Sequence, residues 1–335
     1  MKEARIFGLS GSEDIAQLIA KELDEPLEEI KEKCFEDGES YIRSSVNVRG
    51  RDIYVISSLF SDESQTTSDK LVKLMFFIRS LVDASAKKIT AVIPYLSFAR
   101  QDRKTESRAP INTKGLAIAL ESMGLNRLLT IDVHNLSGFQ NAYRIQTDNL
   151  EAKKLLVNRI VGISQNGKKI DPLIDTTNKN IVIVCPDAGG AGRADAFAKE
   201  LSNKLEYDIE VVYVNKIRTP DGLKGGKIIG EVENKTAIVV DDLIATGGTI
   251  RLAQKAVEAQ GGEFWGVACT HGLFVGKANE NLSEVKNILI TDTVNPFRLS
   301  STNKERLHIV DTSKIFASAI KRIHEGVGSI SDLLG

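Results

Sequence analysis

The sequence predicts an α/β protein built as two tandem domains, each a mostly parallel sheet flanked by helices. Short apolar runs rich in Val and Ile recur along the chain and are typical of strands buried on both faces. Segments of helical period lie between many of these runs, so strand and helix alternate. With 335 residues, the chain is longer than one hydrophobic core usually serves, which indicates two domains.

Ten apolar runs define the predicted strands. In chain order they are ARIFGL from Ala4, DIYVISS from Asp52, ITAVIPYL from Ile89, RLLTIDV from Arg127, NIVIVCP from Asn180, IEVVYV from Ile209, TAIVVDD from Thr236, EFWGVAC from Glu263, NILITD from Asn287 and RLHIVD from Arg306. Helical period predicts helices in DKLVKLMFFIRSLVDA from Asp69, TKGLAIALESMG from Thr113, RADAFAKELSNKL from Arg193 and TIRLAQKAVEAQG from Thr249.

A faint internal similarity supports two related halves. AVIPYLSFAR from Ala91 and VIVCPDAGGAGR from Val182 both show a strand, a proline, a loop and an arginine. We place the boundary near residue 150, which gives domains 1–150 and 151–335. The polar stretch 164–180 is expected to be a surface excursion before the first strand of the second domain.

The overall composition excludes several kinds of partner. The 44 basic residues are balanced by 45 acidic ones, so neither nucleic acid nor a membrane surface is expected to bind. The start of the chain has no uninterrupted apolar h-region, and no later run approaches the roughly 18 residues of a membrane span. We therefore expect a cytoplasmic protein. Cys34, Cys185 and Cys269 are too scattered for a disulfide framework or a cysteine zinc site, and the last two are expected in buried strands.

The segment AIVVDDLIATGGTI from Ala237 is the most informative motif. An apolar strand leads into Asp241 and Asp242 and then into a Thr-Gly-Gly-Thr turn that opens a helix. The glycines allow successive backbone N–H groups to converge on one anion at the helix N-terminus, which indicates a phosphate site. Carboxylates would repel that phosphate, so they serve sugar hydroxyls or a bound Mg²⁺. The inferred ligand is a sugar phosphate.

This loop resembles the ribose-5-phosphate loop of phosphoribosyltransferase-type folds, including the ribose-phosphate pyrophosphokinases, which make phosphoribosyl pyrophosphate (PRPP). The resemblance implies two tandem phosphoribosyltransferase-like domains. It also implies ribose 5-phosphate binding by Arg218 and by a loop whose members are Asp241, Asp242, Ala245, Thr246, Gly247, Gly248 and Thr249. Ala245 replaces an acid that this family often carries, and DDLIATGGT is closer to the loop of adenine phosphoribosyltransferases.

Two further segments resemble the ATP-binding segments of the same family. AVIPYLSFARQDRK from Ala91 implies that Arg100, Gln101 and Asp102 contact ATP. From the composition of this segment alone, an ordinary basic surface loop is an equally good interpretation. CFEDGES from Cys34 implies a second ATP segment formed by Phe35, Asp37, Gly38 and Glu39. In this family the second segment reaches the ATP of a neighbouring subunit. A homo-oligomer built on dimers, up to a hexamer, is therefore implied.

The resemblance also assigns metal ligands and a catalytic pair. His134, at a strand end, and Asp187, before a glycine pair, are implied ligands of the Mg²⁺ on the triphosphate. Imidazole is not the preferred ligand of Mg²⁺, so His134 can also act through water or phosphate. Lys216 and Arg218 match the family's K-x-R pattern. The two cations of this pattern close over the reacting phosphates, where they would stabilise the negative charge that develops.

The five segments occur in the family's order and imply a Mg²⁺-dependent ribose-phosphate diphosphokinase. Such an enzyme transfers the β,γ-diphosphoryl group of ATP to the C1 hydroxyl of ribose 5-phosphate, giving PRPP and AMP. Two alternatives stay open at this point. One is a phosphoribosyltransferase that consumes PRPP, for which the sugar-phosphate loop would suffice. The other is a catalytically silent regulatory subunit associated with a synthetase, against which the presence of Lys216, Arg218 and both loop acids argues.

Overall fold

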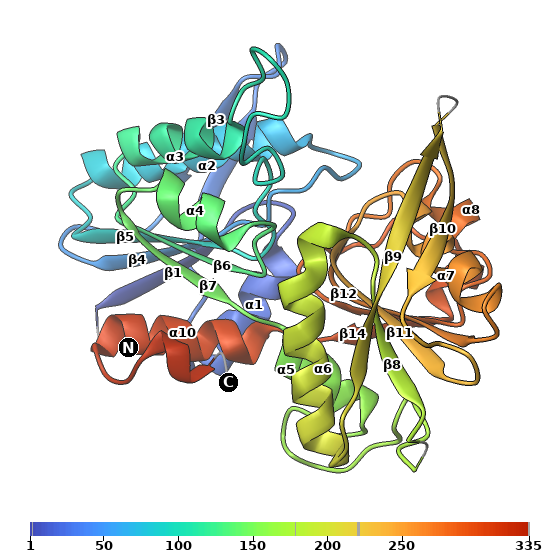
Figure 1. Cartoon of the computed structure of the whole chain (residues 1–335). Coiled ribbons are helices and arrows are strands. Elements are labelled where there is room, and N and C mark those ends of the chain that lie inside the picture. The colour runs from blue at the N-terminus through green and yellow to red at the C-terminus, as the bar shows by residue number, and fades with distance from the viewer. Residues whose placement is uncertain (2, 178, 220–221, 334–335) are drawn as a thin grey trace. The chain divides into compact units, whose positions relative to one another are not determined.

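The computed structural model describes residues 1, 3–177, 179–219 and 222–333, with side chains left out for residues 216–225. The chain divides into two compact units (Figure 1). The first contains Met1–Glu151, Thr293–Asn295 and Thr312–Gly335, and the second contains Ala152–Asp292 and Pro296–Asp311. Among the helices of the described residues, none is long and apolar enough to cross a membrane.

The first unit is built on a five-stranded sheet in which every neighbouring pair is parallel. Its strands, in spatial order, are β1 (Ala4–Gly8), β4 (Asp52–Ile56), β5 (Lys88–Ile93), β6 (Arg127–Ile131) and β7 (Gln146–Leu150). A separate antiparallel hairpin is formed by β2 (Ile30–Cys34) and β3 (Ser40–Ser44). The parallel order places the carboxyl ends of β5 and β6 side by side, which positions the loops that follow them.

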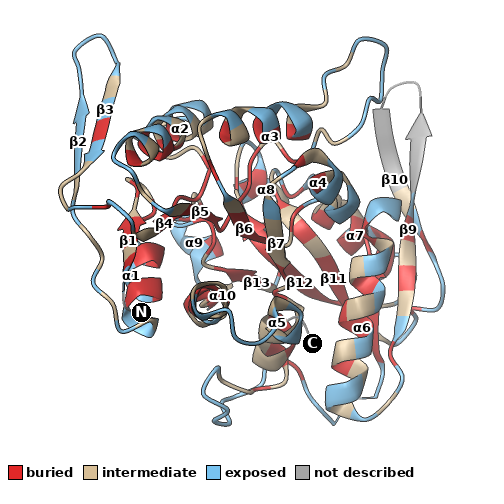
Figure 2. Cartoon of the chain, turned by 90° about the vertical axis from the view of Figure 1, so that its left-hand side faces the viewer, coloured by how far each residue is buried: buried red, intermediate tan, exposed pale blue. Residues whose placement is uncertain are grey.

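Helices cover both faces of this sheet (Figures 1 and 2). α2 (Thr67–Asp83) and α3 (Asn112–Ser122) lie on one face, with α4 (Leu136–Ala142) beside α3, while α1 (Glu13–Glu22) and α10 (Ser313–Glu325) lie on the other. α2 begins with a capping box, because Thr66 Oγ1 accepts from Asp69 N at 3.1 Å and the Asp69 carboxylate accepts from Thr66 N at 2.8 Å.

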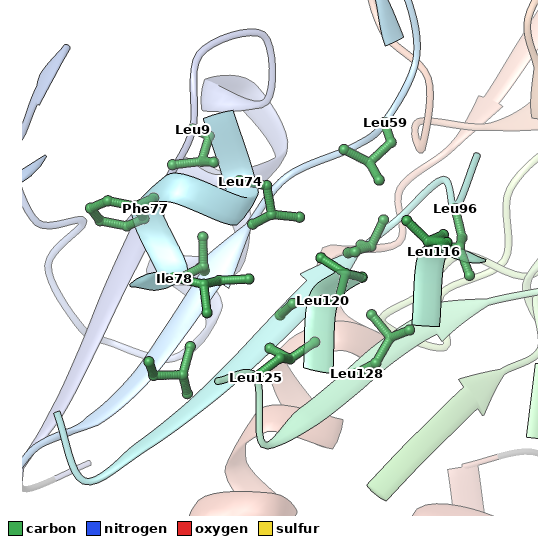
Figure 3. Close-up of a cluster of buried hydrophobic side chains, with 14 of the residues drawn as sticks. Leu9, Leu59, Leu74, Phe77, Ile78, Leu96, Leu116, Leu120, Leu125 and Leu128 are labelled. Carbon is green, nitrogen blue, oxygen red and sulfur yellow. The ribbon is translucent and has the colours of Figure 1, made fainter. Parts of the chain in front are cut away.

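The core between α2, α3 and the sheet consists of aliphatic side chains and a few aromatic rings (Figure 3). Leu74, Phe77 and Ile78 of α2 have no exposed surface, and the Phe77 ring packs edge-on against Phe7 of β1 at 5.3 Å between centroids. Burying a side chain of this kind contributes roughly 1.5–3 kcal/mol each. The strands therefore cannot shift under the helices without losing much of this energy.

The second unit contains a seven-stranded sheet that is parallel except for one edge pair. Its spatial order is β10 (Gly222–Ile229), β9 (Glu210–Thr219), β8 (Ile181–Cys185), β11 (Thr236–Ile244), β12 (Glu263–Gly272), β13 (Asn287–Thr291) and β14 (Leu307–Val310), with β9 and β10 antiparallel. The prediction of two mostly parallel sheets is confirmed.

Helices also flank the second sheet. α5 (Lys153–Ile160) packs against α6 (Ala191–Leu205) on one side, and α7 (Gly248–Glu258) with α8 (Ala278–Asn281) lies on the other (Figure 1). Three short helices complete the chain: η1 (Ala188–Gly190), α9 (Ser301–Lys304) and η2 (Ile330–Leu333), the last in the first unit. Cys185 and Cys269 are fully buried in strands, as predicted.

A bulge in β12 fixes the middle of the second sheet. The pairing of β11 with β12 shifts by one residue, because Ala237 pairs with Phe264 and the next residue, Ile238, pairs with Gly266. Trp265 is the extra residue, and its indole N–H donates to Leu173 O at 2.9 Å. Gly266 has a φ of 145°, and a Cβ at this position would lie 2.1 Å from Asn287 O. Only glycine fits there.

We therefore predict that Gly266→Ala destabilises the protein by about 3 kcal/mol or more, since it combines backbone strain with a clash against the backbone of β13. The matched control is Gly115→Ala in α3, where no atom lies within 4 Å of the added Cβ. That control should stabilise the protein by roughly 0.5–1 kcal/mol. Chemical denaturation of both variants measures the difference, and equal stabilities would contradict the role of Gly266.

Candidate active site

The carboxyl edge of the second sheet brings several of the predicted site residues together. β8 and β11 are parallel neighbours, with Val239 paired to Val184. Asp187 follows the end of β8, while Asp241 and Asp242 lie in the last part of β11. The turn formed by residues 245–247 then connects β11 to α7. Three carboxylates and a helix N-terminus therefore lie at one edge of one sheet, where open α/β sheets bind their ligands.

The turn before α7 is held by bonds from a segment later in the chain. Gly247 adopts a φ of 73°, which glycine favours, and Gly248 is the first residue of α7. Val275 N donates to Ala245 O at 2.8 Å, and Asn281 Nδ2 donates to Thr246 O at 2.8 Å. The first N–H groups of α7, an 11-residue helix, carry the positive end of its dipole. The geometry of this turn is suited to bind an anion.

The two acids of β11 face a guanidinium from α6. Arg193 Nη1 lies 3.2 Å from Asp242 Oδ1 and 3.7 Å from Asp241 Oδ1. Asp242 N also donates to Asp241 Oδ1 at 2.9 Å. The side chains of Asp241 and Asp242 are 14% and 6% exposed. The Arg193 guanidinium therefore pairs with both carboxylates.

Burial makes the carboxylate pair electrostatically unfavourable. Loss of hydration raises the pKa of Asp241, and the neighbouring Asp242 carboxylate raises this pKa further. The Arg193 guanidinium opposes both effects, but the pKa stays above its ordinary value of 3.8. Two adjacent acids with one cation are suited to bind hydroxyl groups or a second positive charge.

Asp187 has a structural role at the start of the neighbouring helix. Its Oδ1 atom accepts from Gly189 N at 3.1 Å and from Gly190 N at 3.2 Å, which caps the short helix η1. A carboxylate has about four lone-pair sites, so it can cap this turn and still serve a cation. Among the described residues there is no cluster of three or more His, Cys, Asp or Glu side chains that could hold a metal without other ligands.

In the first unit, the loop after β5 is held against the start of α3. Thr113, which is 2% exposed, directs its hydroxyl to Phe98 O at 3.3 Å and to Gln101 O at 3.4 Å. Thr113 N also donates to Gln101 O at 3.3 Å. Phe98 has a φ of 59°, an unusual value for this residue, so the bonds of Thr113 stabilise a strained turn. Arg100 is exposed beyond this turn.

Asp102, which follows Gln101 in this loop, contacts the segment after β6. The Asp102 carboxylate accepts a hydrogen bond from Asn135 Nδ2, and Asn135 Oδ1 accepts from Gly138 N at 3.0 Å as the N-cap of α4. His134 precedes Asn135 and is exposed. The first unit therefore brings Arg100, Gln101 and Asp102 close to the segment that carries His134.

The hairpin β2–β3 carries the remaining predicted nucleotide residues in its turn. Phe35 N donates to Glu39 O at 2.8 Å, Gly38 N donates to Phe35 O at 3.0 Å, and Asp37 Oδ1 accepts from Glu39 N at 3.1 Å. The Phe35 ring is 42% exposed, and Lys33 Nζ lies 4.6 Å from its centroid. An exposed ring beside a cation is suited to stack on a planar base.

The structure leaves some predicted residues outside its description and adds others. Lys216 and Arg218 belong to β9, but their side chains lie outside the described residues. Asn135 and Asn281 were not predicted from the sequence. An asparagine just before a helix is a cap signal that could have indicated Asn135. No local pattern indicates that Asn281 bonds to a turn 35 residues earlier.

Comparisons with known proteins cover nearly the whole chain. Residues 4–124 match the N-terminal domain of ribose phosphate pyrophosphokinase, and residues 150–297 match the phosphoribosyl transferase domain. The ribose-phosphate pyrophosphokinase of Marinomonas sp. is 33% identical over 326 residues, which covers 96% of both chains. That of Bacillus subtilis is 34% identical over 329 residues, with 97% of this chain and 95% of the relative covered.

A solved structure agrees with these relatives. The crystal structure of phosphoribosylpyrophosphate synthetase from Mycobacterium smegmatis superposes with a TM-score of 0.83 at 26% identity, covering 97% of this chain and 100% of that one.

We predict that Asp241→Asn stabilises the protein more at pH 8 than at pH 5. The folded state of the native protein holds a proton on Asp241 more tightly than the unfolded state does, so its stability falls as pH rises above the ordinary carboxyl pKa. An amide removes this penalty, and the gain near pH 8 should be about 1–2 kcal/mol. Denaturation at both pH values measures it, with Asp208→Asn, an exposed acid of the same unit, as the control. A loss of stability at pH 8 would contradict the electrostatic account.

Proposed function

The chain belongs to the ribose-phosphate pyrophosphokinase family, and from this premise we propose that it transfers the β,γ-diphosphoryl group of ATP to the C1 hydroxyl of ribose 5-phosphate. The products are PRPP and AMP, a reaction of nucleotide biosynthesis that takes place in the cytoplasm. The observation that carries this proposal is the carboxylate pair beside the N-terminus of α7, at the carboxyl end of β11. The relatives that match over nearly the whole chain are named as pyrophosphokinases, which supports an enzyme rather than a silent subunit.

Ribose 5-phosphate binds at the second unit in this proposal. Its phosphate lies on the N–H groups of residues 246–249, with the hydroxyls of Thr246 and Thr249 as further donors. Asp241 and Asp242 accept hydrogen bonds from the ribose hydroxyls, which suits two acids that already lie beside the same Arg193 guanidinium. Ala245 adds no charge to the loop, and its carbonyl bonds to Val275 N.

ATP binds at the first unit. Arg100 supplies a planar guanidinium for phosphate or base, Gln101 can donate and accept at the base, and Asp102 lies next to them. The hairpin residues Phe35, Asp37, Gly38 and Glu39 serve the ATP of a neighbouring subunit, where the exposed Phe35 ring stacks on adenine. This arrangement requires a homo-oligomer built on dimers, up to a hexamer.

Magnesium is the cofactor in this proposal, and the residues present fit it. Mg²⁺ prefers oxygen ligands, keeps several waters and is held in nucleotide sites by one or two protein groups together with phosphates. Asp187 offers a carboxylate that the turn before α6 already orients through two N–H groups. His134 would be a second ligand, either directly or through water. When bound, the ion would neutralise charge on the triphosphate.

The chemistry needs mainly positioning and charge stabilisation. The C1 oxygen of the sugar attacks the β-phosphorus of ATP and loses its proton to solvent, while the bond from this phosphorus to the α-phosphate oxygen breaks and AMP leaves. Lys216 and Arg218 stabilise the negative charge that develops, and Arg218 also contacts ribose 5-phosphate. Asp241 and Asp242 hold the sugar in the orientation for attack.

The reaction itself is the first test. Purified protein with ATP, Mg²⁺ and ribose 5-phosphate should form AMP and PRPP in equal amounts, measured together by chromatography, and neither product should form without the sugar phosphate. Omitting Mg²⁺ should abolish turnover. Formation of neither product, with or without added inorganic phosphate, would overturn the proposed function.

We also predict that Lys216→Ala lowers kcat by orders of magnitude while the Kd for ATP changes only a few-fold, since this contact is made mainly in the transition state. Lys227→Ala is the control, because Lys227 is an exposed lysine on the neighbouring strand β10. Steady-state kinetics and calorimetric ATP titration measure the two quantities. Near-normal turnover of the Lys216 variant would rule out its assigned role.

A further inference from the structure

Asn135 connects two segments of the first unit that are far apart in sequence. Its Nδ2 atom donates to the Asp102 carboxylate, in the loop after β5, and its Oδ1 atom accepts from Gly138 N at 3.0 Å, in the first turn of α4. One side chain thus uses its donor and its acceptor on different partners. Both ends of the Asn135 amide are therefore specified, which a simple helix cap would not require.

The backbone of α4 approaches Asp102 closely at the same place. A Cβ added at Gly138 would lie 2.9 Å from the Asp102 Cβ and 3.4 Å from its Oδ2. Any larger residue at position 138 would push the loop and the helix apart. Asp102 therefore packs closely against α4 in addition to accepting its hydrogen bond from Asn135.

The loop around Arg100 is thereby held from two sides. Thr113, at the start of α3, bonds to Phe98 O and Gln101 O on one side, and Asn135 bonds to Asp102 on the other. Arg100 and Gln101 lie between these two attachments. Of the two, only the Asp102–Asn135 bond involves a charged group, and such bonds are about twice as strong as neutral ones.

We propose that Asp102 and Asn135 are a positioning pair that holds Arg100 and Gln101 in the conformation that binds ATP. The inference rests on the proposed function, because it assumes that the loop binds ATP. A loop that is already ordered loses less conformational entropy when its ligand binds, so the pair increases affinity through the conformation of the loop.

The test measures ATP affinity in the full-length protein by calorimetric titration, which does not depend on turnover. Asn135→Ser keeps an N-cap oxygen for Gly138 N but removes the donor to Asp102, and we expect its Kd for ATP to rise about tenfold. The KM for ribose 5-phosphate, which binds at the other unit, should change less than about twofold. Asn141→Ser is the control, because Asn141 is exposed in the same helix. Unchanged ATP affinity in Asn135→Ser would overturn the proposal.

A partner swap separates positioning from simple helix capping. Asn135→Asp keeps the cap but turns a carboxylate towards Asp102, so it should weaken ATP binding more than Asn135→Ser does. Adding Asp102→Asn restores a donor and an acceptor in the reverse order and should recover most of the lost affinity. Circular dichroism checks that the double variant is folded. If the folded double variant does not recover ATP affinity, the proposed positioning role of Asp102 and Asn135 is overturned. Failure of the native protein to bind ATP would instead overturn the proposed function itself.

Discussion

The buried carboxylate pair of β11 is the constraint on which the site depends. Two adjacent acids at the end of an interior strand repel each other, and the repulsion is tolerated because Arg193 approaches both from the first turn of α6. This requires β8, the turn at Asp187 and α6 to keep a fixed geometry beside β11, which the caps on Gly189 and Gly190 provide. A neutral pair would pack more easily, but it would offer weaker hydrogen-bond acceptors. The local conflict is the kind expected where function outweighs stability.

Much of the fold was predictable because its signals are local. Every one of the ten predicted apolar runs overlaps a strand, since runs such as IVIVC are buried on both faces and cannot be mistaken for one face of a helix. Strands with few buried residues were harder to predict. β7, QTDNL, has only one buried residue, and the strands of the β2–β3 hairpin are largely exposed, so neither carries an apolar pattern. Polar residues on an exposed strand discourage pairing with other chains, and such a strand contains no apolar run that would indicate it in the sequence.

The candidate site also has a part that the sequence predicts and a part that it does not. Asp241, Asp242 and the Thr-Gly-Gly-Thr turn are contiguous in sequence, and they form one constellation in the structure. The contacts that hold such segments were not predictable, because Asn281 reaches Thr246 and Asn135 reaches Asp102 across long stretches of chain. An asparagine side chain carries no periodic signal, and its partner depends on tertiary packing. Sequence therefore indicates which groups do the chemistry more readily than which groups hold them.

The position of α10 has a consequence for how the chain is made. This helix belongs to the first unit, where it packs against α1, buries Phe316 and Ile320, and brings His324 within 3.5 Å of Asp52 on β4. It also follows the second unit in the chain, so it leaves the ribosome after that unit. The part of this face that α10 covers stays open while the second unit is synthesised, so the N-terminal half cannot finish folding first. The first unit is therefore synthesised first but completes its folding only after the second unit has been made. A chain that terminated before α10 would expose the apolar residues that α10 covers.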